Sequence, residues 1–300
     1  MNASPRIGID LGGTKIEIAA LGVGGEIIYT RRVPTPAPDY GATLSLIAEI
    51  IEDAEAELGG SATVGIGTPG SLSPKTGLLR NSNSVWMNGK PLASDLIAKA
   101  GRDLRFANDA NCFALSEAVD GAGAGAHSVF GVIIGTGCGG GLVLDGKIIH
   151  GANGIGGEWG HNPLPWPNDS EHPPPPCWCG RAGCQEVWLS GSGLARDHQA
   201  VTGRALSGEE IVRQADEGDA DCARTLDRHA ERLARGLASI CNVFDPEVIV
   251  LGGGLSRLPH LYEQVPAFME PFMFSDHVTT RILPPKHGDA SGVRGAAWLW

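Results

Sequence analysis

The sequence lacks the features of several protein classes. No run of apolar residues approaches the roughly 20 that a helix needs to cross a bilayer, and no run of Lys or Arg stands out in a chain whose formal net charge is −11. Nucleic acids and anionic membranes both attract clustered positive charge, so we expect neither as a partner. Residues 1–5 lead almost directly into a predicted strand. That leaves no room for a signal peptide, and we expect a cytoplasmic protein.

A disulfide framework is not expected either. The chain has seven cysteines, an odd number, and thiols stay reduced in the cytosol. Three of the seven, Cys177, Cys179 and Cys184, lie within eight residues of one another. This cluster needs an explanation other than a set of disulfide bonds.

The composition is that of an ordinary globular protein. Of 300 residues, 42% are hydrophobic and 19% are charged, which is typical of a folded chain with a sizeable core. Helical spacing of apolar residues predicts helices over 44–58, 91–101, 220–244 and 290–300, and a further helix ending near 119. Short apolar runs predict buried strands over 63–67, 105–107 and 248–251. The alternation of strands and helices predicts an α/β fold.

Glycine is plentiful, with 44 residues, and three glycine-rich turns each follow a predicted buried strand. The first two turns repeat one pattern of three strands, over residues 6–33 and again over 132–149. Only glycine turns sharply while leaving backbone N–H groups bare enough to approach phosphate oxygens. The repeat therefore predicts two similar lobes with phosphates held between them, and favours a nucleotide-dependent phosphotransferase.

Each turn has its own expected role. In the first, Thr14 and Lys15 accompany the backbone, and Asp10 is placed to orient a hydrated Mg²⁺. The second is similar to an anion-binding nest, and the third would let an adenosine lie against the backbone. None matches the P-loop or the dinucleotide fingerprint, and the alternative that all three are only tight hairpins stays open. The residues concerned are Gly8, Ile9, Asp10, Leu11, Gly12, Gly13, Thr14 and Lys15; Gly135, Thr136, Gly137, Cys138, Gly139, Gly140, Gly141 and Leu142; and Gly252, Gly253 and Gly254.

Asp109 is a candidate catalytic base. It lies where a predicted strand gives way to a helix, between Asn108 and Asn111. A kinase that acts on an alcohol needs a carboxylate to accept the hydroxyl proton and to aim the oxygen at the γ-phosphate. An N-cap aspartate is an equally good interpretation of the same position.

The cysteine cluster predicts a metal site. Cys177, Cys179 and Cys184, with His161 upstream, offer three thiolates and an imidazole, a set suited to a structural Zn²⁺ ion. Unliganded thiols, or a different histidine such as His150 or His172, are the alternatives. The surrounding segment 151–187 is rich in proline and has no core of its own, so a metal would give it order.

Two acidic residues flank this cluster, Glu158 and Glu186. Carboxylates bind sugar hydroxyls well, although solvated surface acids are the plainer interpretation. Trp159, Trp166 and Trp178 lie in the same stretch. They are candidates for the wall of a sugar site, with packing as the alternative role for most of them.

The chain resembles the ROK family of bacterial sugar kinases over essentially all of its length. The resemblance is carried by Asp10-Leu11-Gly12-Gly13-Thr14-Lys15, Asn108-Asp109-Ala110-Asn111, Gly135-Thr136-Gly137-Cys138-Gly139, Gly157-Glu158-Trp159-Gly160-His161, the cysteine cluster and Gly252-Gly253-Gly254. Within the family, the segments Trp86–Pro91, Gly157–Trp166 and Lys286–Asp289 are most similar to fructokinases of the manno(fructo)kinase type. The related N-acetylglucosamine kinases usually carry phenylalanine where this chain has Trp159.

The resemblance implies an actin-like ATPase fold of two ribonuclease-H-like lobes around a cleft. The N-terminal lobe would be 1–119, joined by the C-terminal helix 289–300, and the C-terminal lobe would be 120–288 with a zinc-binding insertion at 151–187. It also implies a homodimer. The expected reaction is ATP-dependent phosphorylation of a hexose at its 6-hydroxyl, with D-fructose as the substrate; kinases of N-acetylglucosamine, N-acetylmannosamine or glucose, and more remotely a non-catalytic sugar-sensing regulator, are the alternatives.

The resemblance further implies a role for each matching residue. Asp109 would be the general base. The segments Gly8–Lys15 and Gly135–Leu142 would bind ATP phosphates and Mg²⁺. His161, Cys177, Cys179 and Cys184 would bind Zn²⁺. The residues expected in the sugar pocket are Gly70, Asn108, Asp109, Glu158, His161 and Glu186.

Overall fold

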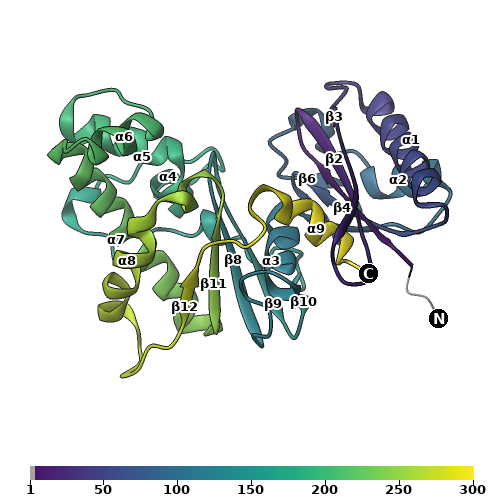
Figure 1. Ribbon diagram of the computed structural model, residues 1–300. Helices are drawn as coiled ribbons and strands as arrows, with labels where there is room; N and C mark the ends of the chain where they lie inside the picture. The colour runs from purple at the N-terminus through teal and green to yellow at the C-terminus, as the bar shows by residue number, and fades with distance from the viewer. Residues whose placement is uncertain (1–3) are drawn as a thin grey trace. The chain divides into compact units, whose positions relative to one another are not determined.

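The computed structural model describes residues 4–300 and confirms the predicted α/β class (Figure 1). The expectation about the signal peptide rests in part on residues 1–3, which lie outside the described residues. Within residues 4–300, none of the helices combines the length and the apolar character that a bilayer-spanning segment requires.

The chain divides into two compact units. The first comprises the residues up to Gly125, the segment Gly141–Gly156 and the C-terminal segment Lys286–Trp300; the second comprises Ala126–Gly140 and Gly157–Pro285. The boundaries expected above, 1–119 with 289–300 and 120–288, differ from this division mainly at 141–156. Ile148 of that segment packs against Ala107, Cys112 and Ala296 of the first unit, which accounts for the difference.

Two five-stranded sheets share one strand order. In the first, β1 pairs antiparallel with β2 and parallel with β4, which pairs parallel with β7. The second repeats this, with β8 parallel to β11 and β11 parallel to β12. The sheets consist of β3 (Ile27–Pro34), β2 (Lys15–Leu21), β1 (Arg6–Leu11), β4 (Thr63–Thr68) and β7 (Arg105–Asn108), and of β10 (Lys147–Ile148), β9 (Cys138–Leu144), β8 (Ser128–Ile134), β11 (Val248–Gly252) and β12 (Arg281–Leu283). A short hairpin adds β5 (Ser71–Leu72) and β6 (Leu79–Arg80).

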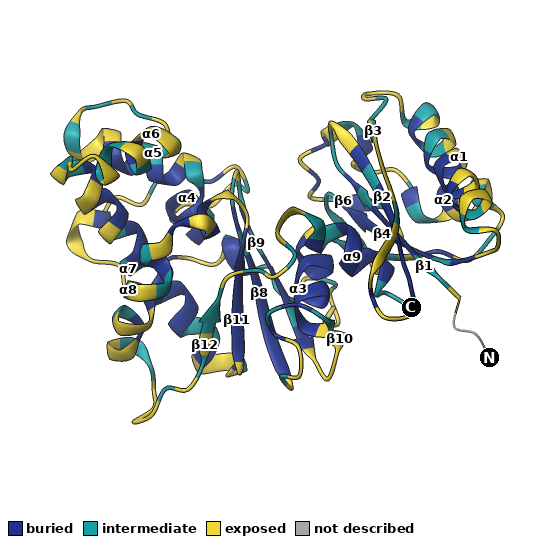
Figure 2. Ribbon diagram, in the orientation of Figure 1, coloured by how far each residue is buried: buried dark blue, intermediate teal, exposed yellow. Residues whose placement is uncertain are grey.

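The helices follow the apolar periodicity of the sequence. In α1 (Tyr40–Leu58), Asp39 caps the first turn by accepting from Ala42 N at 2.9 Å, and Gly59 ends the helix in a left-handed conformation. Figure 2 shows its buried stripe turned toward the sheet. The first unit also contains α2 (Leu92–Ala100), α3 (Asp109–Val119) and α9 (Ser291–Ala297); the second contains α4 (Gln185–Leu189), α5 (Gly191–Thr202), α6 (Gly208–Asp216), α7 (Ala220–Phe244) and α8 (Pro259–Met269).

The predicted C-terminal helix is shorter than 290–300. It ends at Ala297, and the last three residues leave the helix to make polar contacts with the first sheet. The Trp300 indole N–H donates to the carbonyl of Val64 at 2.7 Å, and the Arg105 guanidinium lies 3.9 Å from the centre of the Trp300 ring. These contacts replace the last, partial turn of the predicted helix, since three residues are fewer than the roughly 3.6 of one turn.

Helix α9 lies unusually close to the backbone of its neighbours in the first unit. A Cβ atom added to Gly8 of β1 would lie 1.9 Å from the carbonyl oxygen of Val293, and one added to Gly295 would lie 1.7 Å from that of Cys112 in α3. Glycine at these two positions therefore allows β1, α9 and α3 to pack backbone to backbone. This packing fixes the ends of β1 and α3 relative to each other.

In the second unit a buried ion network holds the proline-rich insertion against α7. Glu171, 2% exposed, accepts from Arg232 Nε at 2.8 Å and from Arg235 at 2.6 Å, and Arg232 also binds Asp197 at 2.7 Å. Burial opposes ionisation of Glu171, yet the bonds from Arg235 and Arg232 lower its pKa to about 2. These ion pairs therefore bind the insertion to α7 through polar contacts.

We predict that Gly295→Ala destabilises the first unit. The added methyl group has no space because backbone atoms surround it, so the free energy of unfolding should fall by about 2 kcal/mol or more. Gly60→Ala is the matched control, since nothing lies within 4 Å of a Cβ at Gly60, and it should change stability by less than about 0.5 kcal/mol. Urea denaturation measures both, and equal midpoints for the two variants would contradict the backbone contact.

Candidate active site

The carboxyl ends of three parallel strands bring the first group of predicted residues together. Asp10 of β1 lies opposite Gly67 of β4, and Thr68 of β4 lies opposite Asn108 of β7. Asp109 follows directly as the first residue of α3. In open α/β sheets ligands bind at this edge of the strands, so the arrangement is that of a binding site.

Asp10 and Asp109 interact electrostatically. Burial is the main cause that raises the pKa of Asp10 to about 6, and the negative charges of Asp109 and Glu17 raise it further, against the opposing effect of Lys15 and Arg32. A carboxylate in such surroundings gains from a nearby divalent cation, which would offset both burial and repulsion.

The interpretation of Asp109 as an N-cap is wrong. Asn108 caps α3, because its side-chain oxygen accepts from Asn111 N at 2.8 Å. Asp109 Oδ1 accepts from the neighbouring Ala110 N at 2.8 Å. Asn108 is therefore the N-cap of α3, and Asp109 is its first residue.

Two residues that the sequence analysis did not identify, Thr35 and Ser84, contact the first glycine turn. Thr35 belongs to none of the predicted motifs. Its hydroxyl donates to the carbonyl of Gly12 at 2.8 Å, and its N–H donates to the carbonyl of Thr14 at 3.0 Å. The Ser84 hydroxyl oxygen lies 2.5 Å from where a Cβ of Gly13 would be. Neither residue adjoins the turn in the sequence, so no local pattern could have found them.

Gly70 follows β4 and is packed against the segment after β6. A Cβ at Gly70 would lie 2.5 Å from the carbonyl oxygen of Arg80, and the Thr68 hydroxyl donates to the Gly70 carbonyl at 2.6 Å. Gly70 is therefore held within two residues of the strand that pairs with Asn108. Its expected place beside the sugar stays a prediction.

In the second unit the other two glycine turns lie next to each other. A Cβ at Gly135 would lie 3.8 Å from Gly254 N, and the carbonyl of Gly135 accepts from Gly191 N at 2.8 Å. The first turn of α5 therefore adjoins both glycine turns. Sequence analysis missed this contribution, although Ser190, which caps α5 through Gly193 N at 3.1 Å, is a recognisable helix-start signal.

The cysteine cluster brings four potential metal ligands together. The ligand atoms of His161, Cys177, Cys179 and Cys184 all lie within 4.8 Å of one another. Cys177 Sγ is 3.7 Å from His161 Nδ1, and the Sγ atoms of Cys179 and Cys184 are 3.6 Å apart. Zinc bonds of about 2.3 Å to sulfur and 2.0 Å to nitrogen at tetrahedral angles give separations of about 3.6 to 3.8 Å. The donor set thus fits a zinc ion, and within residues 4–300 His161 is the histidine that completes it.

The surroundings of the three thiols, Cys177, Cys179 and Cys184, shift their pKa values, so that all three ionise together only with a cation present. Burial, followed by bonds from the neighbouring thiols, raises the pKa of Cys184 to about 12, and burial raises that of Cys177 as well. The backbone N–H of Arg181 lowers the pKa of Cys179. A divalent cation coordinated by the three sulfurs would bind them as thiolates and release their protons.

The two acidic residues beside the cluster differ. Glu186, in the first turn of α4, is half-buried, and its Oε2 accepts from Cys138 N at 3.1 Å. Glu158 is half-buried before the short helix Trp159–His161 and makes no side-chain cap bond there. Glu186 is therefore not a solvated surface acid.

Trp159 belongs to the core and not to a sugar wall. It is 2% exposed, its ring meets that of Phe130 edge-on with centroids 5.6 Å apart, and its indole N–H donates to the Gly139 carbonyl at 2.9 Å. Its difference from phenylalanine is thus a difference in packing. It carries no information about which sugar is bound.

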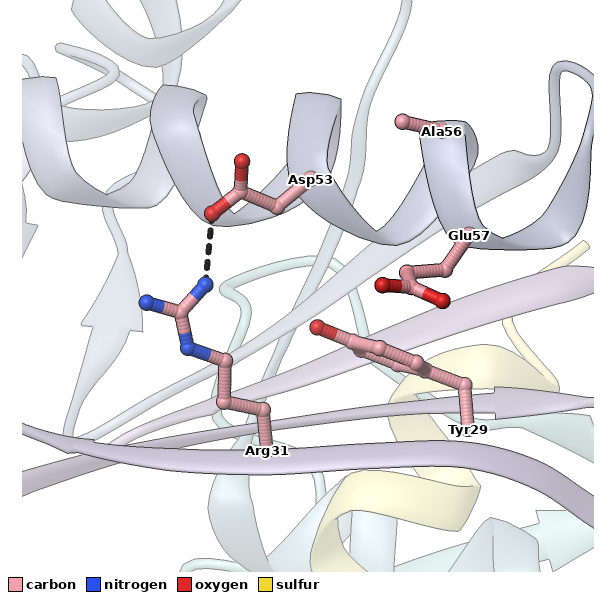
Figure 3. A pocket seen from close by; sticks show the side chains of 5 residues that line it. All are labelled: Tyr29, Arg31, Asp53, Ala56 and Glu57. Atoms are coloured by element: carbon pink, nitrogen blue, oxygen red, sulfur yellow. Dashed lines mark hydrogen bonds and ion pairs between the residues drawn. The ribbon is translucent and has the colours of Figure 1, made fainter.

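An open pocket of about 660 Å³ lies elsewhere in the first unit, between β3 and α1 (Figure 3). Tyr29, Arg31, Asp53, Ala56 and Glu57 line it, and Arg31 and Asp53 form an ion pair at 2.5 Å across it. It contains none of the predicted site residues, and its charged groups are exposed. We assign it no role in the chemistry.

We predict that Asp10→Asn stabilises the metal-free protein at alkaline pH. The folded-state pKa of about 6 exceeds the ordinary value of 3.8, so stability is greatest below 3.8 and falls as the pH rises through 6. At pH 8 the variant should be more stable by about 3 kcal/mol, on the order of a two-unit shift, and at pH 4 the two should be equal. Urea denaturation without Mg²⁺ measures this. The exposed Asp103→Asn should show no such pH dependence, and a constant difference across pH would contradict the assignment.

We further predict that the purified protein binds one Zn²⁺ per chain. Cys179→Ser should lower zinc content well below one because a hydroxyl replaces a thiolate ligand, whereas Cys222→Ala, outside the cluster, should keep it. Elemental analysis after gel filtration gives the stoichiometry. Wild-type protein that takes up no zinc on titration would rule the site out.

Comparisons with known proteins show similarity along nearly the whole chain. An N-acetyl-D-glucosamine kinase from Aliivibrio salmonicida (strain LFI1238) is 42% identical over 296 residues, covering 97% of this chain and 98% of the relative. A ROK hexokinase from Thermus thermophilus has a similar structure, with a TM-score of 0.87, 32% identity and coverage of 98% and 97% of the two chains. A ROK family glucokinase from Streptomyces griseus, solved with glucose and AMPPNP, has a TM-score of 0.77 and 27% identity and covers 98% of both chains.

These similarities confirm the actin-like ATPase fold, whereas the closer affinity to fructokinases is not supported. That prediction rested on the segments Trp86–Pro91, Gly157–Trp166 and Lys286–Asp289, and on Trp159 in place of phenylalanine, whereas the similar relative described above is an N-acetyl-D-glucosamine kinase. The family model described as the ROK family matches residues 6–300, nearly the whole chain. This chain therefore belongs to the ROK family of sugar kinases.

Proposed function

We propose that this protein is an ATP-dependent N-acetyl-D-glucosamine kinase that phosphorylates the sugar at its 6-hydroxyl. The observation that carries the proposal is the 42% identity, over nearly the full length, to the N-acetyl-D-glucosamine kinase of Aliivibrio salmonicida. The carboxylate of Asp109, the candidate general base, also supports a kinase reaction. Fructose, the substrate first expected, is not retained.

Asp109 acts as the general base in this proposal. Its carboxylate accepts the proton of the 6-hydroxyl as the oxygen attacks the γ-phosphate, and it aims that oxygen along the line of displacement. Asp10 lies near the end of β1 and Asp109 begins α3 directly after β7, so both belong to one edge of the first sheet. Asp10 would hold Mg²⁺ through water, which screens the phosphates and disperses the charge of the transferred group.

The glycine turns supply backbone donors for the phosphates. The turns within residues 8–15 and 135–142 are assigned to the phosphates, although the N–H groups of Gly12, Gly135 and Cys138 donate within the protein. The Thr14 hydroxyl and Lys15 are exposed beside the first turn. A protein of net charge −11 depends on such local donors to bind a polyphosphate. The AMPPNP in the related Streptomyces griseus glucokinase supports ATP as the donor.

In the first unit, sugar hydroxyls are assigned to Asn108 and to the segment of Gly70. Asn108, whose oxygen caps α3, keeps its amide N–H groups as donors, and Gly70 follows by two residues the Thr68 that pairs with Asn108. Glu158, His161 and Glu186 are assigned to the other hydroxyls. The distance from Nδ1 of His161 to Cys177 supports metal ligation through Nδ1, which leaves Nε2 for the sugar. The homodimer and the cytoplasmic location stay predictions.

A panel of hexoses tests the substrate. With ATP and Mg²⁺, kcat/KM for N-acetyl-D-glucosamine should exceed that for glucose, mannose, N-acetylmannosamine and fructose by at least about tenfold, since a pocket built for a polar substituent rejects sugars that lack it. A coupled ADP-release assay measures the ratios. A preference for any other sugar of the panel would overturn the substrate assignment while leaving the kinase assignment intact.

The base is tested in the same assay with Asp109→Asn. It should lower kcat by about 10²- to 10⁴-fold and change KM much less, because proton acceptance is needed only in the transition state. Asp103→Asn, an exposed acid of the same unit, is the control and should be fully active. Full activity in Asp109→Asn would remove the catalytic role.

A further inference from the structure

Trp178 lies inside the cysteine cluster and is not packed as a core residue. It stands between Cys177 and Cys179, and it is 70% exposed. Its ring meets the His161 ring edge-on, with centroids 5.0 Å apart and an angle of 85° between the planes. A large aromatic side chain held this openly beside potential metal ligands is not explained by burial.

The polar end of Trp178 binds the carboxylate of Glu186. The indole N–H donates to Glu186 Oε1 at 2.6 Å, a short bond to a charged acceptor of the stronger kind. Trp178 is thus joined to the cluster through its own backbone and to Glu186 through its side chain.

The second oxygen of Glu186 binds the glycine turn before β9. Oε2 accepts from Cys138 N at 3.1 Å, and a Cβ at Gly137 would lie 2.8 Å from the same oxygen. Both carboxylate oxygens are therefore directed, one by Trp178 and the other by the backbone of the turn. Without Trp178, a single bond would remain, and the carboxylate could rotate about its side-chain torsions.

We propose that Trp178 is a positioning residue that transmits the order of the metal cluster to Glu186. Ligation of Cys177 and Cys179 fixes the backbone on both sides of Trp178, and the indole N–H then fixes the orientation of the Glu186 carboxylate. The inference rests on the proposed function in one respect, since Glu186 is assigned there to a sugar hydroxyl. Metal occupancy thereby sets sugar affinity without the metal touching the sugar.

Trp178→Phe tests the link because it keeps an aromatic ring and removes the N–H donor. The KM for N-acetyl-D-glucosamine should rise about tenfold, with kcat within about twofold and zinc content unchanged. Trp166→Phe is the matched control. Trp166 is 48% exposed in the same insertion, but its ring contacts Phe272 with centroids 5.0 Å apart, and this variant should behave as wild type. Unchanged KM in Trp178→Phe, or a fall in kcat alone, would overturn the proposal.

Removal of zinc provides a second, independent readout. Sugar binding is measured by calorimetry without ATP, before and after chelation with a thiol-competing chelator. Wild-type protein should lose about tenfold in affinity on chelation, whereas Trp178→Phe, already weakened, should lose clearly less, with the remaining loss coming from His161. Equal losses in the two proteins would show that the metal acts by another route.

Fluorescence separates failure of this inference from failure of the proposed function. Chelation should change the indole emission of wild type and of Trp166→Phe, and the change should be largely lost in Trp178→Phe, whichever sugar is the substrate. A protein that phosphorylates another hexose would refute the substrate and still test Trp178 with that hexose. An identical emission change in all three proteins would refute the link.

Discussion

The close packing of backbone against backbone around α9 is the constraint on which the first unit depends. Side chains are absent at Gly8 and Gly295, so β1, α9 and α3 approach at distances that a methyl group would prevent. The catalytic candidates Asp10 and Asp109 lie at the ends of β1 and α3. Burial is the main cause of the raised pKa of Asp10, and the negative charge of Asp109 raises it further.

The insertion of the second unit adds polar contacts to a small apolar core that includes Trp159. The buried carboxylate of Glu171 is held by Arg232 and Arg235 of α7, and the ligand atoms of the cysteine cluster lie within 4.8 Å of one another. Buried ion networks of this kind tolerate little disturbance, since loss of one partner leaves an uncompensated charge.

The elements themselves were largely predictable, but several contacts were not. The strands and the long helix α7 follow from apolar periodicity, and the repeated three-strand pattern correctly indicated two sheets of one topology. The roles of Asn108 and Asp109 could not be separated by spacing, because both positions suit a cap, and hydrogen bonding assigned the cap to Asn108. Thr35 and Ser84 were missed because they meet the first glycine turn only through the fold. Trp159 was one basis of the fructokinase prediction, but its side chain packs against Phe130 in the core.

The sequence by itself determined the fold class, the family and the chemistry of the ligands, because glycine turns, a carboxylate after a strand and a Cys-x-Cys cluster are local patterns. Only the tertiary structure decided which histidine completes the cysteine cluster, which of Asn108 and Asp109 caps α3, and which indole N–H contacts Glu186. The physical reason is that hydrogen bonds and ligand geometry act over about 3 to 4 Å in space. Residues far apart along the chain reach such distances only after the backbone has folded.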